Sequence, residues 1–246
     1  MEDVKPKKDL LLWSGGLDST SIFFKYFLKR NPIDLVYFDL QNNHRKSRAE
    51  LTARDRIKQI LKFNYPDASM YLSSITDRVY EINEIHPVRN GAVSYWQPFI
   101  WLTSLIQIIN TDVEYQNVIL GYIQKDDFWH IRREFEDAYK NLQYVVSPHD
   151  GIKWPTLSYP FEWKSKQDLV NELSEHKVGR LILDQIWTCE MPRDEEFELL
   201  SCGLCLPCKK LKELRTAVAI SELYLEKMKD EVIDLGQTQE GIQVLG

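Results

Sequence analysis

The chain has 246 residues, of which 43% are apolar and 28% charged, and its formal net charge is −6. This length suits one large domain, or one domain with a small appendage. The net negative charge provides no overall field that would draw the chain to nucleic acid or to an anionic membrane. No apolar run reaches the roughly 18 residues that span a bilayer, and the N-terminal stretch does not read as a signal peptide, so we expect a cytoplasmic protein without a membrane partner.

Short apolar runs alternate with amphipathic segments along most of the sequence. The apolar runs predict strands over residues 9–13, 33–38, 69–72 and 116–120. Segments with helical spacing or mixed polarity predict helices over residues 17–30, 49–63, 128–142, 165–176 and 211–230, and the strongly apolar stretch 96–110 is long enough for a buried helix. Strands that alternate with helices imply right-handed crossovers, so we expect an α/β fold with a doubly wound, mostly parallel sheet of Rossmann-like type. Residues 147–160 are rich in Pro, Gly and Ser and predict a loop or a change of subdomain.

The first predicted strand runs directly into the stretch LWSGGLDST, residues 12–20. In open parallel sheets, ligands bind at the carboxyl ends of the strands. Gly15 and Gly16 allow backbone N–H groups to approach an anion closely, and the start of a helix favours negative charge. The stretch is neither a Walker A motif nor GxGxxG, so it predicts a different kind of phosphate loop. A tight strand-to-helix turn with a capping residue is the alternative interpretation.

Asp18 is an unusual residue for a phosphate site, because a bare carboxylate repels phosphate. Its presence makes sense if it holds Mg²⁺ or caps the helix. The hydroxyls around it, on Ser14, Ser19 and Thr20, would add hydrogen-bond donors to the same loop.

All four cysteines lie within a span of 20 residues, in the pattern C-x12-C-x2-C-x2-C. Two overlapping CxxC steps aim several thiolates at one ion, and four thiolates suit a tetrahedral structural Zn²⁺ site. An iron–sulfur cluster and unligated buried cysteines are the alternatives, since four cysteines are chemically ambiguous. The predicted metal ligands are Cys189, Cys202, Cys205 and Cys208.

The string SGGLDST resembles the SGGxDS signature of the PP-loop ATP pyrophosphatases. The resemblance implies that the loop holds the β- and γ-phosphates of ATP, with Mg²⁺, and that the enzyme adenylates a carboxyl or carbonyl oxygen and releases pyrophosphate. A nitrogen or sulfur nucleophile would then displace AMP. The loop residues implied to bind the nucleotide are Ser14, Gly15, Gly16, Leu17, Asp18, Ser19 and Thr20.

The loop together with the C-terminal cysteines resembles the 7-cyano-7-deazaguanine synthase family across about 200 residues. The matching segments are FDLQNNH at 38–44, Arg89-Asn90, Arg132 with Glu134 and Phe135, Pro160 to Val170, Trp187-Thr188-Cys189 and CGLCLPC. The resemblance implies an ATP-dependent carbon–nitrogen ligase that converts a 7-carboxy-7-deazaguanine-type base to the nitrile preQ0 with ammonia, through an amide. It also implies a zinc-bound C-terminal region, which gives a catalytic domain at residues 1–185 and a cysteine region at 186–246.

The resemblance carries further site residues over to this sequence. Phe38, Asp39, His44 and Gly121 are implied to contact the nucleotide, and Arg89 and Lys166 are implied to act with Ser14 and Asp18 in catalysis. The alternative interpretation of Asp39 is a turn residue at the end of a strand. The alternative for the other charged candidates is a solvated position on the surface. Asp126 and Asp127 are further candidates for Mg²⁺ or substrate, and Phe128 and Trp129 for stacking on a base or packing in the core.

The segment DDFWHIR, residues 126–132, departs from the family's DYSGYPDCR, which helps to form the substrate pocket. A diverged defence enzyme that joins the activated deazaguanine to a protein amine is therefore an alternative. A tRNA-modifying PP-loop enzyme is a second one, although the acidic net charge argues against a nucleic-acid partner. A non-catalytic nucleotide-binding or assembly protein is a third. We expect a homodimer.

Overall fold

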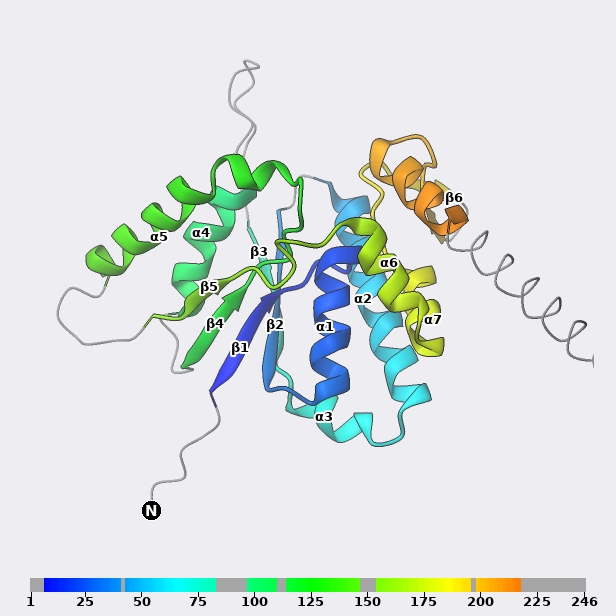
Figure 1. Ribbon diagram of the computed structural model, residues 1–246, viewed down its shortest axis with the longest axis horizontal. Coiled ribbons are helices and arrows are strands. Elements are labelled where there is room, and N and C mark those ends of the chain that lie inside the picture. Colours follow the sequence, from blue (N-terminus) through cyan, green and yellow to red (C-terminus); the bar gives the residue numbers. More distant parts are fainter. Residues whose placement is uncertain are drawn as a thin grey trace, which may run out of the picture.

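The computed structural model describes residues 7–40, 43–82, 97–109, 114–146, 154–195 and 198–217. Its main sheet is built from strands β1 (Lys8–Leu12), β2 (Ile33–Asp39), β3 (Asp77–Glu81), β4 (Tyr115–Ile119) and β5 (Thr156–Ser158). The five strands are parallel and lie in the order β3-β2-β1-β4-β5 (Figure 1). The predicted α/β class with a doubly wound parallel sheet is confirmed, and the chain reverses its direction of winding between β1 and β4.

Seven α-helices and one short 3-10 helix lie in the described ranges with assigned bounds. They are α1 (Leu17–Lys29), α2 (His44–Asn64), α3 (Ala68–Ser74), α4 (Gln97–Ile109), η1 (Asp127–His130), α5 (Arg132–Val146), α6 (Lys166–Ser174) and α7 (Lys177–Gln185). A small antiparallel pair, β6 (Arg193–Glu195) and β7 (Glu198–Leu200), follows α7. Residues 206–217 form a further helix, and the rest of the helix predicted at 211–230 lies outside the described residues.

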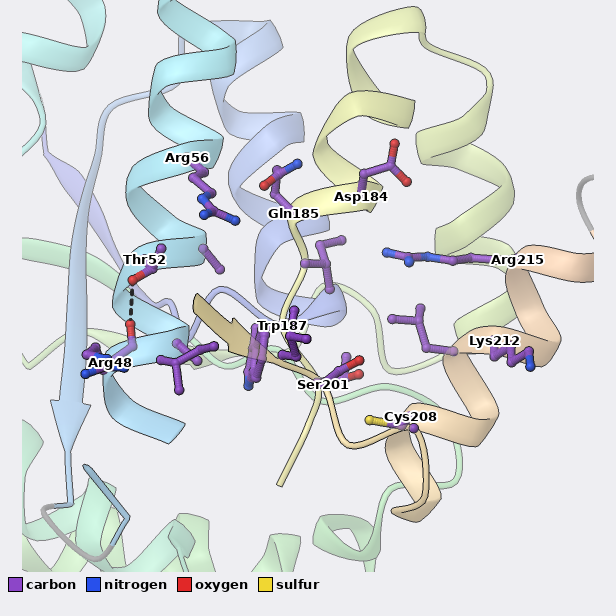
Figure 2. A pocket seen from close by; sticks show the side chains of 18 of the residues that line it. Arg48, Thr52, Arg56, Asp184, Gln185, Trp187, Ser201, Cys208, Lys212 and Arg215 are labelled. Carbon is purple, nitrogen blue, oxygen red and sulfur yellow. Dashed lines mark hydrogen bonds between the residues drawn. The ribbon is translucent and has the colours of Figure 1, made fainter. Parts of the chain in front are cut away.

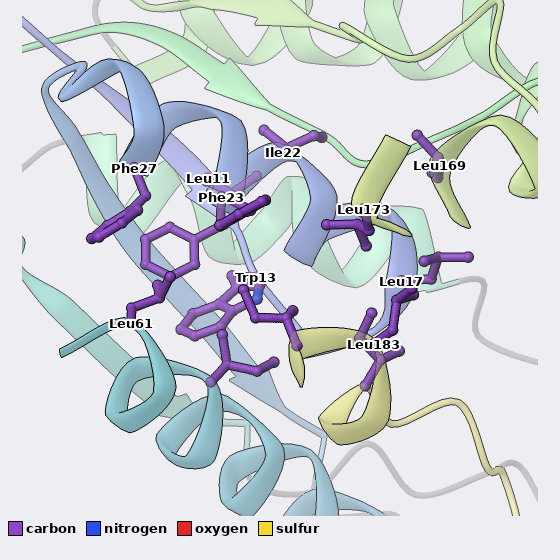
Figure 3. Packing of buried hydrophobic residues seen from close by; sticks show 14 of the residues in the cluster. Leu11, Trp13, Leu17, Ile22, Phe23, Phe27, Leu61, Leu169, Leu173 and Leu183 are labelled. Atoms are coloured by element: carbon purple, nitrogen blue, oxygen red, sulfur yellow. The ribbon is translucent and has the colours of Figure 1, made fainter. Parts of the chain in front are cut away.

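The sheet is covered on both faces, because successive strand side chains point to opposite sides. Leu11 packs with residues of α1, α2, α6 and α7 in one apolar cluster (Figure 3). Leu10 and Leu12 pack with residues of α4 and α5 in a second cluster. Figure 1 shows the same division, with α4 and α5 on one side of the sheet and α1, α2, α6 and α7 on the other. β2 is buried at every position, as expected for an inner strand of a doubly covered parallel sheet.

The prediction of a third strand at residues 69–72 is wrong. These residues lie in α3, and the third strand is β3, a few residues later. The apolar run Met70-Tyr71-Leu72 is too short for its periodicity to distinguish a strand from a helical turn. β3 alternates half-buried and exposed positions, as an edge strand does, and so carries little apolar signal of its own.

Two other elements were not expected. β5 lies inside the predicted loop 147–160 and is only three residues long. α7 contains Gly179, a poor helix former, and a Cβ at that position would collide with the carbonyl oxygen of Leu173. The glycine therefore lets α7 pack closely against the end of α6.

The helix predicted at 128–142 begins at Arg132, because η1 occupies the preceding residues. The predicted domain boundary between residues 185 and 186 falls at the end of α7 and stays a prediction. In the described part of the chain, no helix combines the length and the apolar character needed to cross a membrane.

Candidate active site and metal centre

The stretch SGGLDST makes the turn from β1 into α1. Gly15 has a φ of +80°, which L side chains rarely adopt, and Gly16 precedes the first residue of α1 as its capping residue. The N–H of Gly16 donates to Oγ of Ser14 at 3.3 Å, and the N–H of Ser14 donates to Oγ of Ser19 at 3.3 Å. Hydroxyl groups and amides therefore gather at the N-terminus of α1, where the helix dipole favours an anion.

The glycines of this region allow close backbone approach. A Cβ on Gly15 would lie 3.0 Å from the carbonyl oxygen of Glu50 and 3.1 Å from Cγ of Arg54, both on α2. Gly121 follows β4, and a Cβ there would lie 3.1 Å from the backbone nitrogen of Ser19. The chain leaving β4 therefore passes directly against the first turn of α1. This contact lies where the strand order reverses, the usual position of a ligand site in such sheets.

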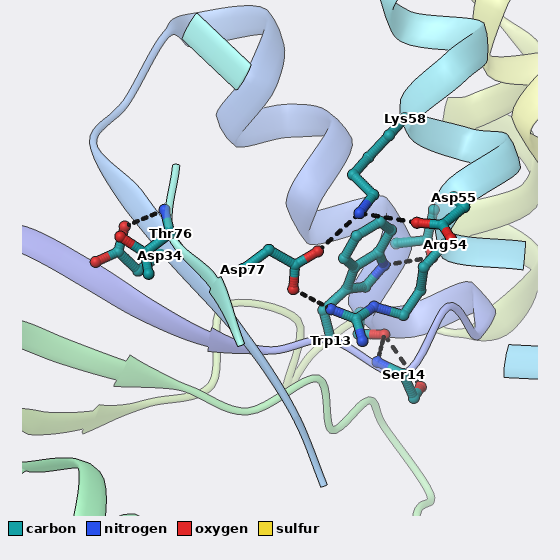
Figure 4. A network of polar contacts seen from close by, with 10 residues as sticks. Trp13, Ser14, Asp34, Arg54, Asp55, Lys58, Thr76 and Asp77 are labelled. Atoms are coloured by element: carbon teal, nitrogen blue, oxygen red, sulfur yellow. Dashed lines mark hydrogen bonds and ion pairs between the residues drawn. The ribbon is translucent and has the colours of Figure 1, made fainter. Parts of the chain in front are cut away.

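Arg54 of α2 supports the glycine loop from behind (Figure 4). Its side chain is 2% exposed and forms an ion pair with Asp77 of β3. The guanidinium carbon lies 4.8 Å from the ring centroid of Trp13 and 5.1 Å from that of Tyr37. Burial lowers the pKa of Arg54, and the neighbouring Asp77 opposes that effect. Lys58 binds the same carboxylate at 2.9 Å, so two cations compensate Asp77.

Asp18 lies in the first turn of α1, and its Oδ1 is buried without a hydrogen-bond partner. Nζ of Lys166, at the start of α6, is 3.8 Å from Oδ2 of Asp18. Burial raises the pKa of Asp18 to about 6, with Lys166 lowering it and Asp126 raising it. A carboxylate oxygen that lacks a protein donor and has a second carboxyl group nearby is the kind of ligand that a hard divalent cation takes. The residues present therefore fit the expected Mg²⁺.

The segment after β4, residues 122–131, is held in place by packing between aromatic side chains. Oδ2 of Asp126 accepts the N–H of Ile123 at 2.8 Å, and burial raises the pKa of Asp126. Phe128 is buried and stacks on Tyr122, with ring centroids 3.8 Å apart and planes 1° from parallel. Nε1 of Trp129 donates to the carbonyl oxygen of Ile123 at 2.5 Å. Phe128 therefore belongs to the core, one of the two roles considered for it.

The structure also places the candidates at the end of β2. Phe38 and Asp39 are both buried. The ring of Phe38 lies in the cluster beneath α4, and Oδ1 of Asp39 accepts the hydroxyl of Ser47 on α2 at 2.5 Å. His44 is exposed and is the first residue of α2. These contacts give Phe38 and Asp39 structural partners of their own, while Arg89 lies outside the described residues.

The four cysteines converge on one point, and their sulfur atoms all lie within 4.8 Å of one another. The N–H of Cys202 donates to Sγ of Cys189 at 3.2 Å, and the N–H of Cys205 donates to Sγ of Cys202 at 3.3 Å. Gly203 permits this tight turn with a φ of +67°. The backbone N–H groups of Cys205 and Leu204 lower the pKa of Cys202 to about 6. Four converging sulfurs with backbone donors can hold a tetrahedral metal ion.

The cysteine region, here residues 186–195 and 198–217, is joined to the glycine loop. The N–H of Trp187 donates to the carbonyl oxygen of Gly15 at 3.1 Å, and its Nε1 donates to the carbonyl oxygen of Cys189 at 3.0 Å. Nζ of Lys46 on α2 pairs with Oε2 of Glu190 at 2.5 Å. Neither Arg54 nor the backbone link through Trp187 was foreseen, since each depends on a partner that is distant in the sequence.

A parallel sheet of this order, with an SGGLDST turn after its central strand, defines the PP-loop class of α/β proteins. A family model described as queuosine biosynthesis protein QueC matches residues 8–217. The chain therefore belongs to the QueC family.

Among solved structures, the chain is similar to a 4-thiouridine synthetase that was crystallised as a complex with RNA and with bound ATP. The two chains share 15% identity, with a TM-score of 0.32. The match covers 90% of this chain and 53% of the synthetase chain, so the present chain spans about half of that length. No curated protein matches the sequence.

Proposed function

We propose that the chain binds ATP at the glycine loop and adenylates the carboxylate of a 7-deazaguanine-type base, which ammonia then attacks. The observation that supports this proposal best is the SGGLDST turn at the switch point of the sheet, in a chain that belongs to the QueC family. We also propose a cytoplasmic homodimer, which size-exclusion chromatography with light scattering would test.

In the proposed complex, the amides and hydroxyls of the loop bind the β- and γ-phosphates. Oγ of Ser14 and Oγ of Ser19 lie 3.3 Å apart, within hydrogen-bonding distance. Both hydroxyl groups can rotate toward a phosphate oxygen. Asp18 supplies its unpartnered oxygen to Mg²⁺, which when bound would neutralise charge on the departing pyrophosphate. Lys166 lies close enough to Asp18 to bring a positive charge to the same site.

The proposed reaction replaces a poor leaving group by a good one. A carboxylate oxygen of the base attacks the α-phosphorus of ATP, and the bond from that phosphorus to the bridging oxygen breaks, which releases pyrophosphate. The nitrogen of ammonia then attacks the acyl carbon, AMP leaves with the carboxyl oxygen, and a proton is lost to give the amide. Adenylation of the amide oxygen by a second ATP, followed by elimination of AMP and protons, gives the nitrile.

The protein's contribution to these steps is positioning and electrostatic stabilisation. The cations near the loop stabilise the charge that develops on the pyrophosphate, and the tight packing behind Gly15 holds the amides in place. Arg89 is proposed to neutralise a carboxylate or a phosphate through its paired guanidinium donors. We assign no general base. Phe38, Asp39 and His44 are proposed to border the nucleotide, the first two mainly through backbone position.

The four cysteines are proposed to hold Zn²⁺ in a structural role. Four protein sulfurs close the coordination sphere and leave no position for a substrate or water. An iron–sulfur cluster uses the same ligands and would be distinguished by its visible absorption.

A protein amine in place of ammonia is the alternative acceptor. The observation that favours it is the aromatic closure after β4, where Phe128 and Tyr122 stack in a segment that differs from the family's pocket sequence. A tRNA substrate is the remaining alternative, and a gel shift with tRNA would detect it.

A pyrophosphate-release assay tests the proposal directly. The chain is incubated with ATP, Mg²⁺ and 7-carboxy-7-deazaguanine, with and without ammonia, and the products are separated by mass spectrometry. Release that requires the base supports adenylation, and a nitrile or amide product identifies ammonia as the acceptor. A mass increase on a protein would identify a protein amine. If ATP is never cleaved in the presence of the base, the enzymatic proposal is wrong.

A further inference from the structure

A cavity of about 1030 Å³ lies between α2 and the cysteine region, beside the glycine loop (Figure 2). Its walls come from α2, from the end of α7 with residues 186–188, from β7 with the turn that follows it, and from the helix at 206–217. None of the side chains in these walls has a part in the proposed adenylation. The volume is at the upper end of the range of about 300–1000 Å³ that is typical of small-molecule sites.

Positive side chains line this cavity from two opposite walls. Figure 2 shows Arg56 of α2 and Arg215 of the helix at 206–217 extending toward each other. Arg48 and Lys212 lie on the same two elements, and Asp184 is the single carboxylate among the lining residues. Basic side chains on the walls of a cavity give it a positive potential, which favours an anionic ligand.

Arg215 adds a more specific observation. One of its terminal nitrogens donates to the carbonyl oxygen of Leu183, which anchors the guanidinium at the end of α7. Its Nε is buried and has no hydrogen-bond partner. Buried donors are nearly always satisfied, and the planar guanidinium matches the oxygens of a phosphate group. Arg215 therefore stands in the cavity wall as an oriented cation, held in place by its bond to the end of α7.

Trp187 supplies an apolar surface between the two basic walls (Figure 2). Its Nε1 donates to the carbonyl oxygen of Cys189 and its backbone N–H to Gly15, so the residue is fixed at both ends. A fixed indole beside oriented cations suits a ligand that has a flat ring as well as a phosphate.

We propose that this cavity is a second nucleotide site, which binds a nucleoside phosphate separately from the glycine loop. The phosphate lies between Arg56 and Arg215, and the base packs against Trp187. The nucleoside phosphate is either a free nucleotide or a unit of an RNA strand, and the two sources share the same chemistry.

Isothermal titration of the zinc-loaded full chain tests the proposal, with AMP, GMP, CMP, UMP, hexauridylate and inorganic phosphate as probes. We expect at least one nucleoside monophosphate to bind. Arg56→Gln should lower its affinity about ten-fold or more, because the variant loses a hydrogen bond to a charged group. Trp187→Leu should weaken the binding of the nucleotide and leave the affinity for inorganic phosphate unchanged. Arg133→Gln, on the exposed face of α5, is the matched control and should bind as the wild type does.

The outcomes separate the possibilities. Hexauridylate that binds about ten-fold tighter than UMP identifies an RNA strand as the source, and equal affinity identifies a free nucleotide. Binding that is lost in Gly15→Ala but retained in Arg56→Gln would place the nucleotide in the glycine loop and overturn the proposal. Nucleotides that bind no better than inorganic phosphate would overturn it too. Zinc content and thermal melting of each variant confirm that the fold is intact, and the pyrophosphate assay reports on the adenylation proposal independently.

Discussion

The backbone N–H of Trp187 donates a hydrogen bond to the carbonyl oxygen of Gly15, at 3.1 Å. This bond joins the first residues of the cysteine region to Gly15, whose positive φ shapes the glycine loop. The metal centre and the proposed ATP site are therefore mechanically connected, although they lie more than 170 residues apart in the sequence. A change at the cysteines should reach the loop through this connection.

We expect Cys205→Ser to lower metal content, thermal stability and pyrophosphate release together. A structural metal contributes its binding free energy to folding, and removal of one thiolate weakens that binding. Zinc by mass spectrometry and thermal unfolding measure the first two effects. Leu206→Ser, an exposed neighbour, is the control and should change neither. A Cys205→Ser protein that keeps its full zinc content and its melting temperature would refute the ligand assignment.

Gly15→Ala should abolish most of the pyrophosphate release. The left-handed conformation costs an L residue about 1–2 kcal/mol. The added Cβ would also press against the carbonyl oxygen of Glu50 at 3.0 Å and against Arg54. Arg133→Ala, at an exposed position of α5, is the control and should keep wild-type turnover. Equal turnover by Gly15→Ala and wild type would show that the loop geometry is not needed.

Arg54→Met should lower the free energy of unfolding by about 1.5–3 kcal/mol, the usual contribution of a buried hydrogen bond to a charged group, because Asp77 keeps Lys58 as a partner. The loss would also remove the surface on which Trp13 and the loop rest, so pyrophosphate release should fall. Lys58→Met is the control, because Lys58 shares Asp77 but is more exposed, and should cost about 1 kcal/mol or less. Urea unfolding measures both. Similar costs for the two variants would contradict the role given to Arg54.

Asp18→Asn should raise the free energy of unfolding at high pH and abolish pyrophosphate release. Burial raises the pKa of Asp18 from 3.8 to about 6, so the folded state favours the protonated carboxyl. The stability that this group contributes is therefore present at low pH and is lost as the pH rises through about 6. The variant cannot ionise, so in the absence of nucleotide it should be more stable than the wild type near about pH 8, with a smaller difference near about pH 4.

Urea titrations of Asp18→Asn at the two pH values provide the measurement, and pyrophosphate release should be lost. Asp137→Asn, on the surface of α5, should show no such pH-dependent gain. If the variant is less stable than the wild type at the higher pH, then neighbouring groups such as Lys166 stabilise the ionised Asp18, and the prediction is wrong.

Contiguous features of the sequence were read correctly. β1, β2 and β4 have apolar runs, α1 has apolar residues at helical spacing, and the four cysteines lie close enough in sequence to reveal their convergence. β3 was missed because an edge strand needs only one covered face, so DRVYE has no long apolar run. Arg54 looked like one charge among many on a polar helix. Its burial depends on Asp77 and Trp13, which no local pattern connects to it.

The close approach of Gly121 to Ser19 has a consequence for how this chain can be re-engineered. The glycine loop belongs to the β1–α1 unit, and the segment after β4, which departs from the family's pocket sequence, passes against it at Gly121. Residues 122–131 can therefore be exchanged as a cassette, provided that Gly121 and Asp126 are kept. Chimaeras built in this way should trade acceptors and retain the same ATP chemistry, which makes this glycine the natural junction for swapping specificity between members of the family.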